Sequence, residues 1–205
     1  MMATRDPSPN GGGSFAVRHA DGLREAFRWL NRFMVPLWRL GLGGMLNSWP
    51  SVGGRLMVLV HRGRRSGREY RTPLNYAIVD DDVYCLAGFG TATDWYRNAL
   101  AAPTVEVWLP DGWWEARAID VPNGPNRIAL LRAVLIGSGF AAYVAGIDPK
   151  RWTDSRLQEK TGDYRLLRLE RTTARTGPGG PGDLAWVWPW ATLVLAAALR
   201  RRPRH

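Results

Sequence analysis

Cysteine, histidine and lysine are scarce in this chain of 205 residues. The single cysteine, Cys85, excludes an intrachain disulfide and a metal site built from cysteines. The histidines His19, His61 and His205 lie far apart in the sequence, so a histidine-based metal site is not expected either. We therefore predict a protein without a metal centre, in a cytoplasmic setting where thiols stay reduced.

A recognisable secretory signal and a long apolar run are also missing. Residues 1–15 are rich in proline, glycine and serine and have no apolar core, which predicts a disordered leader. The longest apolar run, residues 184–199, would extend about 24 Å as a helix. That length is short of the roughly 30 Å of a bilayer's hydrocarbon core.

Acidic residues are outnumbered, with 18 against 28 basic residues and a net charge of +10. Nearly all the basic residues are arginines, whose planar guanidinium groups favour bidentate contacts with phosphate or carboxylate. This balance permits a nucleic acid, an anionic lipid surface or an acidic small ligand as partner. The arginines form no long basic stripe, so we expect no nucleic-acid partner.

The middle of the chain has the rhythm of short strands. Six segments rich in β-branched and aromatic residues are separated by turns, and residues 110–112 join two of them as a hairpin would. Two helical stretches, 94–101 and 126–136, interrupt the series. The pattern predicts a mainly β fold with flanking helices (α+β), in which residues 51–174 form an antiparallel barrel. The predicted strands are 55–61, 71–79, 83–87, 105–109, 113–121 and 164–171.

Two terminal segments flank the predicted barrel. Residues 16–50 have apolar residues at helical spacing with arginines between them, which predicts an amphipathic helix that covers the sheet or lies on a membrane. Residues 175–183 have the composition of a Gly/Pro linker. Residues 184–205 form an apolar tail with tryptophans at one end and arginines at the other. Three states of this tail are compatible with its composition: membrane-bound, packed on the protein or a second copy, or disordered. One expected location is therefore peripheral or tail-anchored, at the inner face of the plasma membrane.

Two glycine-bearing loops are candidates for holding an anion. The first, residues 63–67, carries Arg64 and Arg65 and joins two predicted strands. The second, residues 88–90, precedes the helix at 94–101, whose start favours a negative group and has Thr91 or Thr93 as candidate N-cap. Each loop alone is also typical of a solvated turn. Together they would clamp a ligand with a negatively charged tail.

The order of these motifs resembles the deazaflavin-dependent nitroreductase family. The resemblance rests on "GRRSGREYRTPLNY", "YCLAGFG" and "DWYRNALAAPTVEVWLPDGWWEARA", and it extends from about Met34 to Arg171. It implies a split antiparallel β-barrel of the flavin-reductase type that binds the deazaflavin coenzyme F420. Members of this family transfer hydride from reduced F420 to quinones, nitro compounds or other unsaturated acceptors. We therefore expect a reductase whose acceptor is a small hydrophobic molecule.

The resemblance also implies where the coenzyme lies. The arginine turn would hold its phosphate and glutamyl tail, and the neighbouring strands and loop would border its ring system. Tyr143 is the candidate proton donor to the reduced acceptor, with His61 and Tyr76 as weaker alternatives. The implied coenzyme-binding residues are Arg64, Arg65, Ser66, Gly67 and Arg68 in the turn, Val58, Leu59, Val60, Pro73 and Leu74 on the strands, Gly88 and Phe89 on the loop, and Trp95, Tyr96 and Asn98 at the helix start.

Two positions depart from the family's pattern. Arg65 replaces the family's lysine in the turn, which keeps the charge and changes the geometry. Gly88 stands where some quinone-reducing members have serine, so a hydroxyl beside the ring is missing and the acceptor is left open. Two further hypotheses also stay open: a barrel reductase that uses FMN, and a non-catalytic module that binds anions or lipid.

Overall fold

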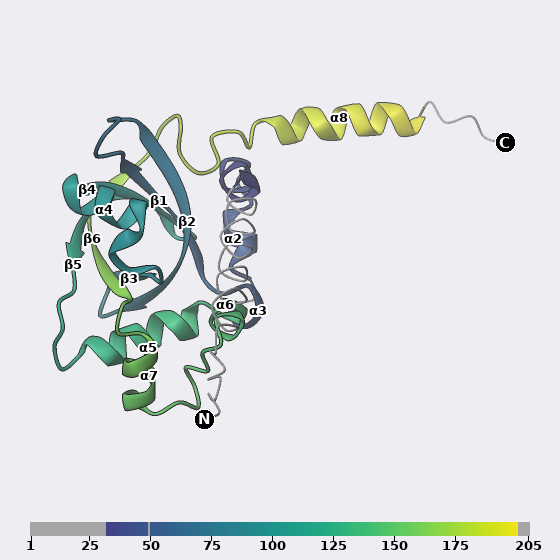
Figure 1. The fold of residues 1–205 in the computed structure, drawn as a ribbon. Helices are drawn as coiled ribbons and strands as arrows, with labels where there is room; N and C mark the ends of the chain where they lie inside the picture. Colours follow the sequence, from purple (N-terminus) through teal and green to yellow (C-terminus); the bar gives the residue numbers. More distant parts are fainter. Residues whose placement is uncertain (1–31, 49, 201–205) are drawn as a thin grey trace, which may run out of the picture.

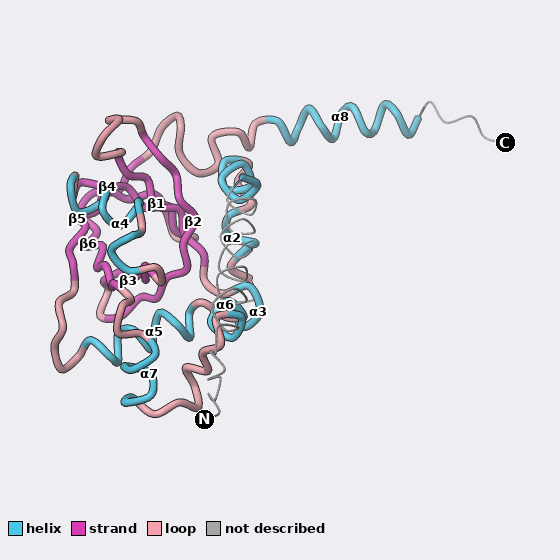
Figure 2. Tube along the Cα trace, in the orientation of Figure 1, coloured by secondary structure: helices cyan, strands magenta, loops and turns pink. Residues whose placement is uncertain are grey.

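The computed structural model of the protein describes residues 32–48 and 50–200. Six antiparallel strands close into a barrel in the order β1-β2-β3-β6-β5-β4, and helices flank it (Figure 1 and Figure 2). This confirms the predicted mainly β fold, and a strand is found at each of the six predicted places. The strands are β1 (Leu56–Arg62), β2 (Glu69–Val79), β3 (Asp82–Ala87), β4 (Thr104–Leu109), β5 (Gly112–Asp120) and β6 (Arg165–Arg175).

Alternation along the strands sorts side chains between the inside and the outside of the barrel. Met57 and Leu59 of β1 belong to the same buried cluster as Leu167 and Leu169 of β6, and all four are fully buried. Burial of each such side chain contributes about 1.5–3 kcal/mol to stability. The interior is therefore a packed apolar core, which leaves ligand binding to the ends and the outer surface of the barrel.

The outward face of β1 is covered rather than exposed. Residues 32–39 are helical, and Trp38 from this helix packs with Val58 and Val60 of β1 and Trp108 of β4. All four side chains are less than 5% exposed, at 2%, 0%, 4% and 0%. In its described part the helix thus covers the sheet, which is the first of the two interpretations of this segment.

The single helix predicted over residues 16–50 is divided in its described part. After residue 39 the chain turns at Gly41, whose φ of +81° is a conformation that glycine adopts without strain. Two short helices follow, α2 (Gly43–Leu46) and α3 (Pro50–Gly53). The predicted leader at 1–15, the first part of this segment and the end of the tail from residue 201 lie outside the described residues.

The helices inside the barrel sequence lie at its ends and on its outer surface. The 3-10 turn η1 (Gly90–Ala92) leads into α4 (Asp94–Ala101), which occupies the predicted residues, and α5 (Arg127–Gly137) packs over β2 and β3. Two short helices were not predicted, α6 (Phe140–Val144) and α7 (Asp154–Lys160).

The last segment returns to the helix at 32–39 and then leaves the barrel. It ends in α8 (Val187–Arg200), which projects away from the rest of the molecule (Figure 1). In the described part of the chain, no helix has both the length and the apolar character needed to cross a membrane.

Candidate functional site

The arginine turn and the start of α4, which were predicted to form two sides of one site, lie in contact. Arg64 joins them through Asn98, whose Oδ1 accepts from the Arg64 backbone N–H at 3.2 Å and from its Nη1 at 2.9 Å. The same Nη1 lies 3.0 Å from Asp94 Oδ1, and this hydrogen bond lowers the pKa of the Asp94 carboxyl. The half-buried Arg64 therefore holds the turn against α4.

Beyond Arg64, the turn presents its charges to solvent. Arg65 and Arg68 are exposed, as is Arg62 at the end of β1, and within residues 32–48 and 50–200 none of the three makes an ion pair. Ser66 and Gly67, between the arginines, are exposed as well. Exposed guanidinium groups that form no ion pair within the described residues suit a ligand with a phosphate and several carboxylates, because each can form charge-assisted hydrogen bonds with it.

A buried polar chain supports Arg64 from behind. Asn98 is 7% exposed and His61 is 4% exposed. With Asn98 Oδ1 occupied by Arg64, its Nδ2 faces His61 Nδ1 at 3.5 Å, and His61 Nε2 lies 3.0 Å from Thr72 Oγ1. In this arrangement Nδ1 accepts and Nε2–H donates, so the imidazole is neutral. Burial agrees with this, since it lowers the pKa of His61 to about 4. His61 therefore positions Asn98 and Arg64, and it is poorly suited as a proton donor at neutral pH.

This buried histidine predicts a loss of stability in acid. The pKa of His61 falls from its ordinary value of 6.5 to about 4 in the folded protein, so between these values the unfolded chain binds a proton that the folded chain does not. The free energy of unfolding should therefore fall as the pH drops from 6.5 to 4, by about 3 kcal/mol at 1.36 kcal/mol per pKa unit. Urea unfolding measured across this window checks the expectation. A His61→Gln variant, which cannot titrate, should lose less; an equal loss in both proteins would contradict the assignment.

The strand residues implied for coenzyme binding are mostly buried. Val58, Leu59 and Val60 are at most 4% exposed, and Pro73, which pairs with Val58 across the sheet, is buried too. Leu74 is half-buried and packs on the barrel core. These side chains shape the barrel wall and offer little accessible surface to a ligand.

The first turn of α4 packs partly against the barrel core. Tyr96 is 4% exposed, and its hydroxyl donates to Asp120 Oδ1 at 2.6 Å. Burial, and then the Asp120 hydrogen bond, raise the pKa of Tyr96 to about 12. Trp95 packs edge-on against Tyr96 and against the barrel core. Thr93 occupies the N-cap position as predicted, yet its hydroxyl makes no capping hydrogen bond and is buried without a partner in the described chain.

The loop between β3 and α4 is partly open to solvent. Gly88 and Phe89 are exposed, and Gly88 lies near the ring of Tyr164. Gly90 has a φ of +58°, and a Cβ at this position would lie 2.5 Å from the carbonyl oxygen of Asp163. Gly90 therefore lets the loop pass close to the chain before β6 and places the start of α4.

Tyr143 lies apart from the arginine turn. It belongs to α6, and Gly139, just before α6, makes a close backbone approach to Gly54, just before β1. The arginine turn follows the other end of β1, which is about 20 Å long at 3.3 Å per strand residue. In Figure 1, α6 accordingly lies far from the loop between β1 and β2. Tyr143 is 44% exposed, whereas Tyr76 is 4% exposed inside the barrel, where burial raises its pKa. A role for Tyr143 as proton donor stays a prediction.

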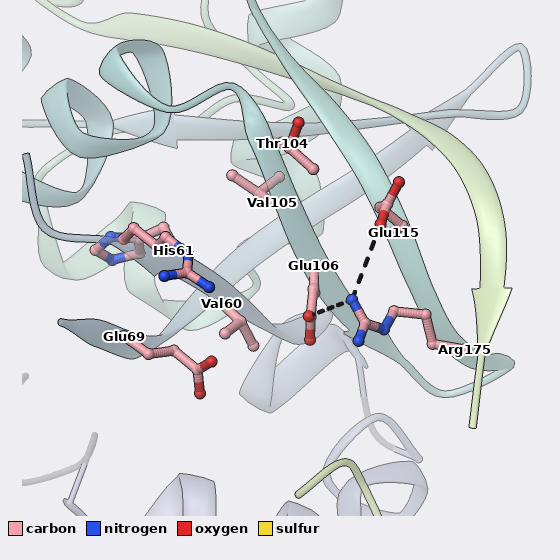
Figure 3. Close-up of a pocket in the computed structure, with 9 residues that line it drawn as sticks. Val60, His61, Glu69, Thr104, Val105, Glu106, Glu115 and Arg175 are labelled. Carbon is pink, nitrogen blue, oxygen red and sulfur yellow. Dashed lines mark ion pairs between the residues drawn. The ribbon is translucent and has the colours of Figure 1, made fainter. Parts of the chain in front are cut away.

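A small pocket, which the sequence did not indicate, opens between the end of β1 and strands β4, β5 and β6 (Figure 3). Arg175 lies between Glu106 and Glu115, at N–O distances of 2.6 and 3.9 Å. The pocket's volume of about 130 Å³ is below the several hundred Å³ of typical small-molecule sites. The carboxylates that line the pocket also disfavour an anion. The lining residues are Val60, His61, Arg62, Glu69, Thr104, Val105, Glu106, Glu115 and Arg175.

Solved structures resemble the fold at low sequence identity. An F420-H2 dependent reductase is 20% identical, with a TM-score of 0.40 over 57% of this chain and 94% of that chain. A conserved hypothetical protein from Mycobacterium tuberculosis is 18% identical, with a TM-score of 0.42 over 66% of this chain and 79% of that chain. A protein of unknown function from Agrobacterium tumefaciens is 20% identical, with a TM-score of 0.42 over 89% of this chain and 65% of that chain. A search of curated proteins finds no match.

A family model shows the relationship. The model described as F420H(2)-dependent quinone reductase matches residues 32–150, more than half of the 205 residues. The matched region contains the arginine turn, the loop at 88–90 and α4, whose arrangement was predicted from the motifs. The expected coenzyme F420 and the expected reductase class are thereby confirmed. The chain belongs to the F420H(2)-dependent quinone reductase family.

Proposed function

We propose that this F420-dependent reductase delivers hydride to a quinone or a chemically similar unsaturated acceptor. The observation that carries the proposal is the row of exposed arginines that form no ion pair with residues 32–48 and 50–200, held beside the start of α4 by Arg64. The family description supplies the acceptor class, and a nitro compound is the second candidate.

The residues of the turn fit the coenzyme. F420 carries a phosphate and a glutamyl tail, and when bound it supplies the hydride. Arg62, Arg65 and Arg68 would hold the negative groups, since within the described residues no acidic side chain pairs with them. Arg64 stays on Asn98 and Asp94 and so keeps the turn in place. The exposed Gly88 and Phe89 are the proposed neighbours of the ring system.

A membrane surface is the proposed place of the reaction. Quinones with long side chains dissolve in lipid, so an enzyme that reduces them gains from staying at the bilayer. The exposed apolar helix α8 and the net charge of +10 support this location.

The proposal is tested by following the oxidation of reduced F420 with quinones, nitroaromatics and enones as acceptors. We expect the full chain to oxidise the coenzyme fastest with quinones. The Arg65→Ala/Arg68→Ala variant is the control, and its rate should be low at coenzyme concentrations that saturate the wild type. If reduced F420 were oxidised only with nitroaromatics, the acceptor would be a nitro compound and not a quinone. No oxidation with any acceptor would contradict the proposed function.

A further inference from the structure

Helix α8 exposes large apolar side chains along nearly its whole length. Trp190, Leu193, Val194 and Leu195 are between 60% and 69% exposed, and Leu199 is 54% exposed. The helix extends into open space away from the barrel (Figure 1). A helix this apolar is not stable in water when it stands alone, so a partner must cover it.

The distribution of these side chains indicates what the partner is. Successive residues of a helix are rotated by about 100°, so Leu193 and Leu195 lie about 200° apart, on nearly opposite sides. Both are at least 60% exposed. A groove on a second copy would cover one side and leave the other in water, whereas the hydrocarbon of a lipid leaflet surrounds both.

The length and the ends of α8 indicate how it would lie in lipid. Its 14 residues span about 21 Å, too short to cross a bilayer. Trp186, Trp188 and Trp190 lie at its start, and "RRRPRH" follows in the sequence from residue 200. Tryptophan prefers the membrane interface, and arginines attract anionic headgroups, so both ends favour the same interface. Pro189, Thr192 and Ala196, spaced by three and four residues, form a narrow strip of small side chains that can face the headgroups.

The base of α8 is fixed to the barrel. Arg39 and Asp183 form a two-pronged ion pair, with Nη2–Oδ2 at 2.7 Å and Nε–Oδ1 at 2.9 Å, and this hydrogen bonding lowers the pKa of Asp183. The Leu184 N–H donates to the carbonyl of Arg39 at 2.9 Å, and Trp188 Nε1 donates to the carbonyl of Leu40 at 2.9 Å. The segment with linker composition is thus bound to the helix that covers β1, and α8 has a defined direction.

We propose that α8 is a rigid arm that seats in one leaflet of an anionic bilayer and holds the barrel at a fixed orientation over the surface. The proposal rests on the proposed function for its purpose, since a lipid-dissolved acceptor is what the arm would bring within reach. Its tests measure lipid binding and motion, so they stand or fall separately from quinone reduction.

The seating is tested by flotation of the full chain with vesicles of phosphatidylcholine and phosphatidylglycerol. We expect the wild type to float with the vesicles and Leu193→Glu/Leu195→Glu to lose at least tenfold in partitioning. Thr192→Glu/Ala196→Glu, which adds the same two charges on the strip of small side chains, should lose less than threefold. The proposal would be overturned if the wild type did not bind the vesicles or if the Leu193→Glu/Leu195→Glu variant bound them equally well. A wild type that forms a dimer and does not bind vesicles would overturn it too.

The rigidity is tested by time-resolved anisotropy of a dye on α8. Because Cys85 is buried and is the only cysteine, a dye attached to Thr192→Cys reports on α8 alone. In the otherwise wild-type protein the dye should tumble with the whole molecule. Adding Asp183→Asn should introduce a nanosecond component as the base loosens, while vesicle partitioning stays within twofold. If the anisotropy decay had a fast component of equal size without Asp183→Asn, α8 would be flexibly tethered, and the proposal of a rigid arm would be wrong.

Discussion

Replacing Arg65 and Arg68 together by alanine should weaken F420 binding about a hundredfold or more and leave the unfolding transition unchanged. Each charge-assisted hydrogen bond to a phosphate or carboxylate contributes about 1.5–3 kcal/mol, which is at least tenfold in affinity. Both side chains are exposed, and neither forms an ion pair in the described part of the chain, so the fold does not depend on them. Calorimetric titration with F420 measures the loss, and urea unfolding measures the stability.

Arg64→Ala should behave differently from the double variant. Its Nη1 donates to the buried Asn98 at 2.9 Å, so the variant should lose about 1–2 kcal/mol of stability as well as coenzyme affinity. Arg151→Ala is the matched control, because this side chain is 88% exposed and belongs to neither loop. If the Arg65→Ala/Arg68→Ala variant bound F420 with unchanged affinity, the arginine turn would be a solvated charged hairpin and not part of the coenzyme site.

Gly90→Ala should destabilise the protein by about 2–4 kcal/mol and also weaken coenzyme binding. The φ of +58° costs a residue with a Cβ about 1–2 kcal/mol. The new Cβ would in addition lie 2.5 Å from the backbone oxygen of Asp163, which cannot rotate away. The loop carrying Gly88 and Phe89 would have to move, and the start of α4 with it. Urea unfolding and calorimetric titration with F420 measure the two effects.

Gly124→Ala is the matched control for this substitution. Among the described residues, and apart from its two neighbours in the chain, no atom lies within 4 Å of the position its Cβ would take, and its φ is not in the positive range that favours glycine. This variant should match the wild type in stability and in affinity. If Gly90→Ala were equally stable, the close passage beside Asp163 would not be what positions the loop.

The barrel could be predicted because strands carry their own signal. Alternation and turn residues locate all six strands, and β4 and β5 form the expected hairpin. Its turn is one residue shorter than the predicted 110–112, because Gly112 already pairs with Leu109. The short helices α6 and α7 could not be predicted, since segments of five and seven residues show no clear period. Their stability comes from tertiary packing, in which Ala142 and Leu157 join the buried cluster of α5. The side of β1 that faces the core also depends on register, which motif matching does not supply.

The candidate site could be predicted in its residue types and less well in their roles. The sequence brings the arginine turn and α4 together only as a hypothesis, because Arg64 and Asn98 are 34 residues apart. Their contact shows that Arg64 holds the turn against α4, and it leaves Arg65 and Arg68 as the residues that we propose bind the coenzyme. Residues 175–183 were predicted to be a linker, and the structure attaches them to the helix at 32–39 through Arg39 and Asp183. These two residues are 144 positions apart, so the glycine-rich composition of the segment gives no sign of their contact.

The claim that this barrel is an F420 enzyme is tested most directly by titrating the full chain with F420 and with FMN. Tryptophan fluorescence follows both titrations, since the chain contains 11 tryptophans. We predict saturable quenching by F420 that an excess of FMN does not reverse. Tight binding of FMN together with no binding of F420 would contradict the account.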